Sequence, residues 1–500
     1  MHYAHCFEDK CKAISISITL LLLSGNLPEG VKLVLSTLSS LGEGLGQSPW
    51  WMPQFVVDFI TPSVIDKHLS RTDAKLGEIS DDTLLHYHVM ADPSKIMAME
   101  LLAKLYELVS FVGETTKLPV FTSKMIQITL EHGMSPLSPL AFVQYGNYVA
   151  IIKQDFEVGY RYVKLGLTLM KQSPSRAHDG QIIFHSTYTR LHVEPMQSAI
   201  EFFFEGFKAA MKSGNTRNAM KCAYFYDCSC FWAGKKLNEV VKSMEETIKQ
   251  MRYHKSLIML FHMLTTVRTA LRLVGKAVIP QQNGLTSAFG ETHNEQDVVE
   301  KIPAGMLSRH FNEMYEAYMF REFDKTRDCA EKYHSLQILT MFKLARYYHR
   351  IFYSGLVSFW IGREINDKKW INTWIARGKE SRVSMEKLTV LASTWNFQNK
   401  MFLLQAEEQF SERNFLLAEK LYDDAITSSK NHKFLNEEAL ANELAGYFYL
   451  DTGRRVKSEH YFSQAEEKYR EWGAIAKAAT LEKYLSNNAT NKESILDIAK

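Results

Sequence analysis

Two consecutive windows near the C-terminal end of the 500-residue sequence repeat one pattern of small and large side chains. The first window, 399–432, carries the pattern at positions 8, 17, 20, 24 and 27, as Ala406, Phe415, Ala418, Tyr422 and Ala425. The second window, 439–472, carries it at positions 8, 11, 15, 20, 24 and 27, as Gly446, Tyr449, Gly453, Ser458, Phe462 and Ala465. Stacked helix pairs need a small residue where two helices cross and a large residue that fills the neighbouring groove. The pattern therefore predicts an array of antiparallel helix pairs.

The spacing is that of a tetratricopeptide unit, which is usually about 34 residues long. Ala425 and Ala465 hold the same position in the two windows and are 40 residues apart, so we expect a longer connection between these units. Earlier parts of the chain keep the spacing more loosely, at Phe156, Gly159, Val163 and Gly166, at Gly214, Ala219 and Ala223, and at Phe323, Thr326 and Ala330. We predict an all-α fold, a degenerate tetratricopeptide-like α-solenoid of antiparallel helix pairs over residues 81–485. Unrelated amphipathic helices are the alternative.

Composition excludes several classes of protein. The chain has 59 Lys and Arg against 56 Asp and Glu, a net charge of +3, which argues against a protein that mainly coats nucleic acid. Six cysteines in 500 residues are too few for a disulfide scaffold, and we expect a cytoplasmic protein. The apolar block Ala13–Leu23 is shorter than the ~20 residues that span a bilayer, and Glu8 and Asp9 stand where a signal peptide has basic residues. No membrane is expected, and a buried helix or an imperfect chain start explains the block better than a signal peptide or anchor.

Glycine and histidine clusters lack the spacing that a phosphate or metal site needs. Gly42, Gly44 and Gly46 follow a helical pattern rather than a strand, and no Lys-Ser or Lys-Thr comes after them, so a flexible loop is expected. His86 and His88 would lie about 200° apart on a helix. Two metal ligands on one helix face need the spacing i, i+4, so no metal site is expected there.

Cysteine and acidic pairs also favour structural interpretations. Cys228 and Cys230 have no second ligand pair at zinc-finger spacing, so they are expected to be reduced, buried thiols in a helix. Two adjacent acidic pairs cannot converge on one helix face and are expected to be solvated near repeat turns; they are Asp423 with Asp424 and Glu437 with Glu438. We predict that the protein is not an enzyme, and we assign it no catalytic, cofactor-binding or metal-binding residue, no cofactor and no small-molecule site.

One stretch, 235–276, is strongly basic, with a local balance of +6. Its cations are Lys235, Lys236, Lys242, Lys249, Arg252, Lys255, Arg268, Arg272 and Lys276, and its acids are Glu239, Glu245 and Glu246. A solvated face is the first interpretation, and a basic face that meets an acidic peptide or domain surface is the alternative. Nucleic acid is not expected as a partner. The run Phe202–Phe204 and the residues Met251, Met259 and Met263 are interpreted as core filling.

The C-terminal repeats resemble a known family of helical regions. Residues that carry the resemblance are Glu407, Ala418, Tyr422, Asp423, Ala425, Ile426, Asn431, Glu438, Ala439, Glu443, Ala445, Phe448, Tyr449, Leu450, Gly453, Tyr461, Ala465, Tyr469, Trp472, Gly473, Ala474 and Lys477. They are similar to the tetratricopeptide-like helical region of large signalling proteins. In those proteins a kinase-like module and an AAA-type (STAND) ATPase precede the region, and a GAF domain with a histidine kinase, or a nucleotide cyclase, follows it. Segments 132–170 and 27–42 resemble the earlier part of the same region and the helical end of the ATPase module.

The resemblance implies an interaction module, because the motifs of the catalytic neighbours are missing. No G-x-x-x-x-G-K-[ST], H-R-D or D-F-G motif occurs in the sequence. We predict a non-catalytic helical-repeat scaffold in signal transduction, which binds protein or peptide partners along an extended concave surface. The alternative is a fragment of a larger ATP-dependent signalling enzyme, an AAA/STAND ATPase with a histidine kinase or nucleotide cyclase, whose catalytic domains are missing from this chain.

The predicted organisation combines the repeat pattern with this resemblance. Its parts are 1–45, a remnant resembling the helical end of an ATPase module; 46–80, a loop-rich connection; 81–275, degenerate helical repeats; 276–305, a long loop; 306–390, helical repeats; 391–485, the best-formed repeats; and 486–500, a polar tail.

Overall fold

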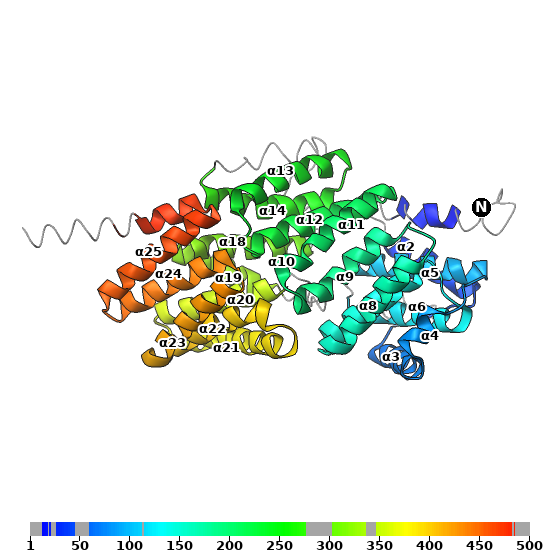
Figure 1. Cartoon of the computed structure of the whole chain (residues 1–500), viewed down its shortest axis with the longest axis horizontal. Coiled ribbons are helices and arrows are strands. Elements are labelled where there is room, and N and C mark those ends of the chain that lie inside the picture. Colours follow the sequence, from blue (N-terminus) through cyan, green and yellow to red (C-terminus); the bar gives the residue numbers. More distant parts are fainter. Residues whose placement is uncertain are drawn as a thin grey trace, which may run out of the picture. The chain divides into compact units, whose positions relative to one another are not determined.

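The structure is a computed structural model that describes residues 13–18, 20–21, 27–45, 60–112, 115–276, 303–336, 347–482 and 485. Within these ranges every regular element is helical, apart from one isolated bridge between Val89 and Met134 (Figure 1). The predicted all-α class is therefore confirmed. Residues 1–12, most of the predicted loop 276–305 and the predicted tail 486–500 lie outside the described part. The described chain divides into two compact units, of which the first holds the residues up to Thr189 with the turn Lys212–Gly214.

The first unit is built from helices joined by short turns. Its labelled elements are α2 (Leu27–Ser40), α3 (Pro62–Gly77), α4 (Asp81–Leu85), α5 (Pro93–Val112), η1 (Thr115–Lys117), α6 (Leu118–His132), α7 (Ser138–Asn147), the π-helical turn η2 (Tyr148–Ile152), α8 (Phe156–Gln172) and most of α9 (Asp179–Val193). Its core lies around α5, α6 and α7, whose apolar side chains are buried on several sides. A helix that is apolar all round belongs inside a protein, which fits these three.

Helix α3 corrects the expectation of a loop-rich connection over 46–80. Residues 46–59 lie outside the described part, but Pro62–Gly77 forms a regular helix. Thr61 caps it, since its hydroxyl accepts a hydrogen bond from the amide of Val64 at 3.4 Å. Pro62 begins this helix, because proline suits the first turn, where no amide hydrogen is needed. The helix stays folded because Leu69 and Leu76 are buried on one face.

The crossing of α7 with α8 is the closest helix contact in the first unit. A Cβ atom at Gly159 would lie 2.5 Å from the amide nitrogen of Ala150 and 2.6 Å from the carbonyl oxygen of Gly146. Gly166 meets the carbonyl of Pro139 in the same way, at 2.7 Å. Small residues along α8 therefore let the two backbones touch, as the loose repeat spacing over 156–166 predicts.

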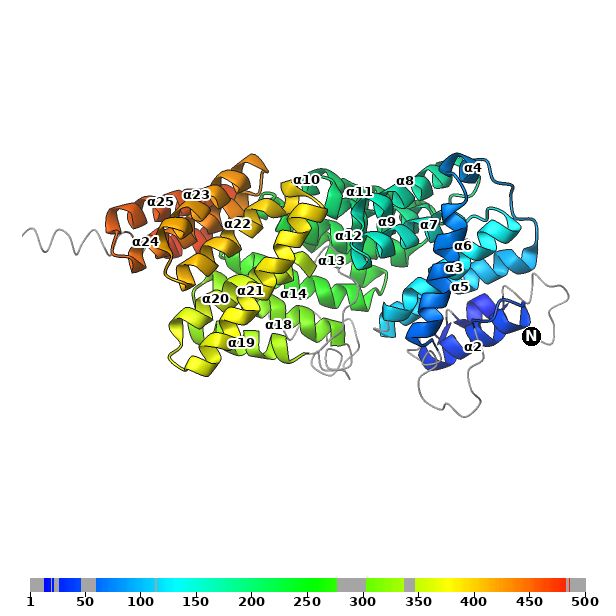
Figure 2. The same cartoon turned by 90° about the horizontal axis from the view of Figure 1, so that it is seen from below.

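The second unit contains the helices from α10 onward. They are α10 (Met196–Ala199), α11 (Glu201–Lys212), α12 (Thr216–Trp232), α13 (Leu237–Tyr253), α14 (Leu257–Val274), α18 (Pro303–Met319), α19 (Phe323–Ser335), α20 (Tyr347–Glu364), α21 (Lys368–Leu391), α22 (Thr394–Ser411), α23 (Phe415–Asn431), α24 (Leu435–Asp451) and α25 (Arg455–Trp472). The chain continues helically over 475–482. Consecutive helices form antiparallel pairs, among them α20–α21, α22–α23 and α24–α25 (Figure 2).

The turns between these helices recur with a period near 20 residues. Eight of these turns contain one residue with a positive φ, at Gly214, Gly234, Lys255 and Gly275, and again at Arg413, Lys433, Gly453 and Gly473. The next residue donates its amide hydrogen to the carbonyl five positions earlier, which closes the last helical turn; Phe434 to Ser429 at 2.9 Å is an example. Two such steps make the 40-residue repeat. The expected longer connection is wrong: α23 and α24 have 17 residues each, and only three residues, 432–434, join them.

Most of the predicted repeat residues pack as the spacing requires. Ala406, Ala418 and Ala425 are completely buried at the helix crossings. A Cβ atom at Gly446 would lie 2.7 Å from the ring of Phe462, so the small residue on α24 makes room for the large one on α25. Phe415 departs from the pattern, since 40% of it is exposed. The second unit is an α-solenoid of antiparallel helix pairs.

Among the described helices, α14 alone has the length and hydropathy of a membrane span. Its 18-residue window is 61% buried inside the protein, and core helices of folded proteins pass the same test. Thr265 and Thr269 on this helix are buried, and Thr265 accepts a hydrogen bond from the amide of Asn312 on α18 at 3.0 Å. These contacts mark α14 as a helix of the core.

Candidate functional site

The inner helices α22 and α24 carry buried polar side chains where an apolar face is usual. We call this set the charged inner face; it comprises Asn396, Asn399, Lys400, Glu407, Glu408, Asn436, Glu437, Glu438, Asn442 and Glu443, all buried. The expectation that Glu437 and Glu438 are solvated is wrong, since they are 1% and 8% exposed. Their partners come from other helices, which a pairwise view of the sequence does not show.

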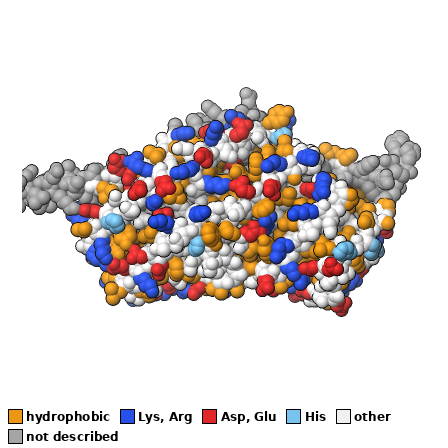
Figure 3. Space-filling view, viewed as in Figure 1, with side chains coloured by type: hydrophobic (Ala, Val, Ile, Leu, Met, Phe, Trp, Pro, Cys, Tyr) orange, Lys and Arg blue, Asp and Glu red, His pale blue; other side chains and the backbone are white. Residues whose placement is uncertain are grey.

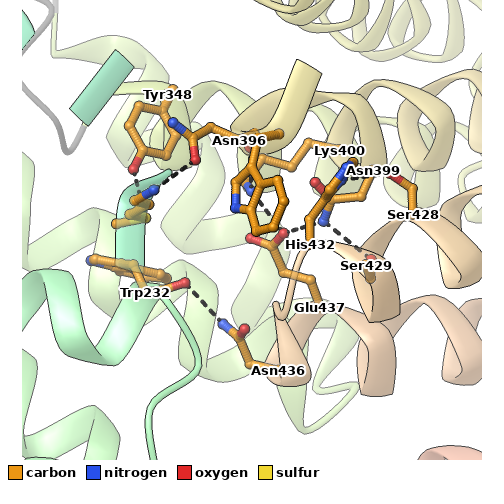
Figure 4. A network of polar contacts seen from close by, with 12 residues as sticks. Trp232, Tyr348, Asn396, Asn399, Lys400, Ser428, Ser429, His432, Asn436 and Glu437 are labelled. Carbon is orange, nitrogen blue, oxygen red and sulfur yellow. Dashed lines mark hydrogen bonds and ion pairs between the residues drawn. The ribbon is translucent and has the colours of Figure 1, made fainter. Parts of the chain in front are cut away.

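Lys400 and Glu437 form an ion pair at the centre of the charged inner face (Figure 4). Lys400 Nζ lies 2.8 Å from Glu437 Oε2, and the two side chains are 0% and 1% exposed. Asn399 donates to the same carboxylate oxygen at 2.5 Å and to the Ser429 hydroxyl at 3.1 Å. Burial raises the pKa of Glu437 and lowers the pKa of Lys400, because both charged forms lose hydration. Glu437 Oε1 has no hydrogen-bond partner.

Two further buried ion pairs connect successive helices. Arg363 on α20 binds Glu407 on α22 at 2.5 Å, and the Tyr422 hydroxyl donates to the second oxygen of Glu407 at 2.5 Å. Lys477 binds Glu443 on α24 at 2.6 Å, and the Tyr469 hydroxyl donates to the other oxygen at 2.7 Å. Each carboxylate is thus held by a cation and a tyrosine. Removing one member of such a pair leaves an uncompensated buried charge, so the pairs fix the helix register.

The last repeat of the second unit packs against an early helix of the same unit. Asn436 donates from its side-chain amide to the carbonyl of Trp232, at 3.2 Å and across 204 residues. Trp472 donates to the carbonyl of Lys235, and Lys236 donates to that of Glu471 at 2.8 Å. Helices that are distant in sequence therefore cover the charged inner face. The inner residues of α22 and α24 pair with one another and with the covering helices, so these residues do not line an open concave surface.

The sequence-predicted candidates for chemistry do not converge on a site. Cys228 and Cys230 are buried in α12, as predicted, and burial raises the pKa of Cys230 to about 12, which keeps it a thiol. His86 ends α4 and contacts Asp82, while His88 lies beyond the helix, so the expected helical spacing of the two does not arise. Gly42 forms a turn after α2. No group of His, Cys, Asp or Glu in the described ranges is arranged to hold a metal ion.

Acids from outside the basic stretch 235–276 neutralise part of it. Lys235 pairs with Glu201 at 2.7 Å, and Arg272 pairs with Glu316 and Glu322. Across the face in Figure 3, charged side chains of both signs lie among apolar ones. The solvated-face interpretation therefore fits better than a single basic field.

Helices α11 and α12 expose apolar side chains, among them Phe204, which was interpreted as core filling. We call Phe204, Phe207, Met211 and Tyr226 the aromatic patch. Phe204 is 42% and Met211 38% exposed, whereas Phe203 beside them is fully buried. Phe204 and Phe207 stack with ring centroids 6.2 Å apart, and Tyr226 of α12 meets Phe204 at 5.5 Å.

The sequence holds a signal for this patch. One helix face takes Phe203, Gly206 and Ala210, which are buried. The residues one position later, at 204, 207 and 211, follow the same i, i+3, i+7 spacing and form a second apolar stripe. The run Phe202–Phe204 was interpreted as core filling throughout, although Phe203 belongs to the buried stripe and Phe204 to the exposed one.

Comparisons with known proteins return structural likenesses only. No family model and no curated protein matches the sequence. The chain is similar to a Rap protein complexed with competence and sporulation factor, at 7% identity over 89% of this chain and 99% of that one, with a TM-score of 0.37. It is also similar to the P58(IPK) TPR domain, at 11% identity over 84% and 98%, with a TM-score of 0.17. A circular tandem repeat protein matches at 11% identity over 96% and 98%, with a TM-score of 0.14. Scores this low establish no shared arrangement, so the fold class rests on the helices of this chain.

Proposed function

We propose that the protein is a non-catalytic helical-repeat scaffold that binds a segment of a partner protein on its outer surface. The observation that carries the proposal is the second apolar stripe of α11. A surface helix normally has one apolar stripe facing the core and a polar face toward water. Here Phe204 and Met211 project on the other side, next to Phe207 and Tyr226. Exposed aromatic and methionine side chains are the usual anchors of protein interfaces.

The charged inner face is a poorer candidate for binding. Lys400, Glu407 and Glu443 already have buried partners of opposite charge or hydroxyl donors. A peptide would have to displace these bonds and separate the helices that cover them. Catalysis is equally poorly supported, because no carboxylate or thiol of this face combines accessibility with a neighbouring base.

We further propose a cytoplasmic signalling context, in which the scaffold links an upstream switch to a downstream output. Its support is the resemblance carried by Tyr469, Trp472, Gly473, Ala474 and Lys477 to the helical region of large kinase-like/AAA/GAF signalling proteins. The fragment alternative makes a distinct prediction, since an adjoining reading frame would then encode a Walker motif, a histidine kinase or a cyclase. Sequencing the full transcript decides between a separate scaffold and such a fragment.

The binding proposal is tested by selection of displayed 20-residue peptides on the immobilised full chain. Selected peptides are then measured in solution by fluorescence anisotropy against the wild type and Phe204→Ala. We expect selected peptides whose affinity falls at least tenfold in Phe204→Ala, since a central aromatic anchor carries a large share of binding energy. Leu416→Ala is the matched control, because Leu416 on α23 is 86% exposed and lies outside the patch. If selected peptides bind Phe204→Ala and wild type equally, the patch is not the site.

A further inference from the structure

The hairpin of α11 and α12 has an unbroken run of positive charge next to the aromatic patch. From Gly206 to Tyr226 the chain contains Lys208, Lys212, Arg217 and Lys221 and no Asp or Glu. This run lies upstream of the basic stretch 235–276 and is separate from it. The nearest acids are Glu205 before it and Asp227 after it, and Asp227 is buried.

Packing of the hairpin places one of these cations, Lys208, beside the patch. Phe203 meets Phe225, and Phe204 meets Tyr226, each with ring centroids 5.5 Å apart. Because α11 and α12 are antiparallel, one helical turn onward along α11 corresponds to one turn back along α12. Lys208 therefore lies level with Lys221 along the hairpin, and the ammonium group of Lys208 lies beside the stripe that runs from Phe204 to Met211.

Lys208 is the exposed cation of this group whose position is best defined. Its ammonium nitrogen lies 4.4 Å from the ring centroid of Phe204. Among the described residues no ion pair involves Lys208, whereas Lys235, the cation 5.6 Å from the centroid of Tyr226, is held by Glu201. A carboxylate arriving at the patch can bind Lys208 without displacing another acid, while an apolar side chain beside it covers Phe207 and Met211.

We propose that the aromatic patch binds an acidic amphipathic segment of a partner protein, with apolar side chains on the rings and a carboxylate toward Lys208. This inference rests on the proposed binding function of the same patch and adds the chemistry of the partner. Charge complementarity selects the segment, because a basic segment would meet four cations in one hairpin.

A matched pair of labelled 20-residue helical peptides tests the partner chemistry on the full chain. Both carry Leu at i, i+3, i+4 and i+7, and they differ only in having Glu or Lys at the flanking positions. We expect the Glu peptide to bind more tightly than the Lys peptide and to weaken as NaCl rises. Lys208→Glu is expected to weaken the Glu peptide by about fivefold, the size of a surface charge effect. Lys420→Glu is the control, because Lys420 is an exposed lysine on α23 outside the patch.

Several results would overturn the inference. If the Lys peptide binds as tightly as the Glu peptide, the patch does not recognise carboxylates. The same follows if Lys208→Glu and Lys420→Glu lower the affinity for the Glu peptide equally. Binding of phosphatidylserine vesicles or of a single-stranded oligonucleotide that is lost in Lys208→Glu would assign the patch to another class of partner. Selected neutral or basic peptides that depend on Phe204 would refute the acidic partner and leave the scaffold function standing. If no selected peptide depends on Phe204 for binding, both the acidic partner and the binding function of the patch are refuted.

Discussion

The indole nitrogen of Trp472 donates a hydrogen bond of 3.1 Å to the backbone carbonyl of Lys235, across 237 residues of chain. Lys236 reinforces this contact through the carbonyl of Glu471. In a helical array each pair usually contacts only its neighbours, so the terminal pairs open first. The second unit instead ties α25 to the turn before α13. We therefore expect the last repeat to be protected as strongly as the interior ones.

Trp472→Phe tests this tie. The variant keeps an aromatic ring in the fully buried site but leaves the Lys235 carbonyl without its donor. An unsatisfied buried acceptor costs about 1–3 kcal/mol. We expect faster native-state hydrogen exchange of the amides in α24 and α25. Trp370→Phe on α21 is the control, since Trp370 is 48% exposed. Equal exchange in both variants would show that the bond does not hold the last repeat.

Lys400→Met tests the central ion pair of the charged inner face. The substitution leaves the Glu437 carboxylate buried without its cation, which is expected to cost about 3–5 kcal/mol. The double variant Lys400→Met/Glu437→Leu should recover most of this loss, because no unpaired charge remains. Calorimetric unfolding at pH 8 measures both. Lys332→Met is the control, since the Lys332–Asp328 pair is exposed and its loss should change little.

The loss of stability in Lys400→Met should also depend on pH. Burial already raises the pKa of Glu437, and removal of Lys400 raises it further. The folded variant then binds a proton that the unfolded chain lacks near pH 5, so folding gains stability as the pH falls. We expect a smaller difference from the wild type at pH 5 than at pH 8. A difference that is constant over this range would mean that Glu437 stays ionised in the variant.

Gly159→Ala tests the helix crossing in the first unit. The added methyl group would meet the amide of Ala150 and the carbonyl of Gly146 within 2.6 Å, and neither backbone atom can move alone. Overpacking of this kind costs about 1–3 kcal/mol. Gly77→Ala at the end of α3 is the control, because nothing lies within 4 Å of its Cβ position, and it should be neutral or slightly stabilising. Thermal unfolding of the first unit measures both, and similar midpoints would contradict the close crossing.

The repeat packing could be predicted because it depends on residues close together in sequence. Ala418, Phe462 and Gly446 meet partners in their own helix pair, so small and large residues recur with the period of the pair. The length of the repeat was misassigned for a local reason. Lys433 and Arg413 adopt a positive φ, a conformation for which glycine is the usual sequence signal. The short turns therefore carry no glycine, and the residues beyond the usual unit length were assigned to a connection instead of to longer helices.

The burial of Glu437 could not be predicted in this way. Its cation lies on another helix, and Trp232, whose carbonyl binds the neighbouring Asn436, lies 204 residues away. Adjacent glutamates at a helix start look solvated unless the covering helices are known. The exposure of Phe204 has a signal in the sequence, because positions 204, 207 and 211 form a second apolar stripe and a surface helix turns one such stripe toward the core.

Asp227→Asn should remove a pH-dependent step from the stability of the second unit. Burial raises the pKa of Asp227 from 3.8 to about 6, against the opposing hydrogen bonds from Ser243 and Thr247. A carboxyl group with a raised folded pKa contributes stability below its unfolded pKa and loses it as the pH rises through the folded value. The wild type is therefore expected to lose stability between about pH 4 and pH 6.5 through this group, by at most about 3 kcal/mol.

Asparagine keeps the acceptor for Ser243, which donates to Oδ1 of Asp227 at 2.5 Å, and it removes the charge. Its amide nitrogen takes the place of Oδ2, which has no partner in the acid. Above pH 7 we therefore expect Asp227→Asn to unfold at a higher temperature than the wild type, and below pH 4 the two should converge or reverse. Asp324→Asn on α19 is the control, because that carboxylate is 88% exposed. If the difference in unfolding temperature between the wild type and Asp227→Asn stays constant from pH 4 to pH 8, Asp227 does not titrate in this range. The assignment of its raised pKa to burial against α13 would then fail.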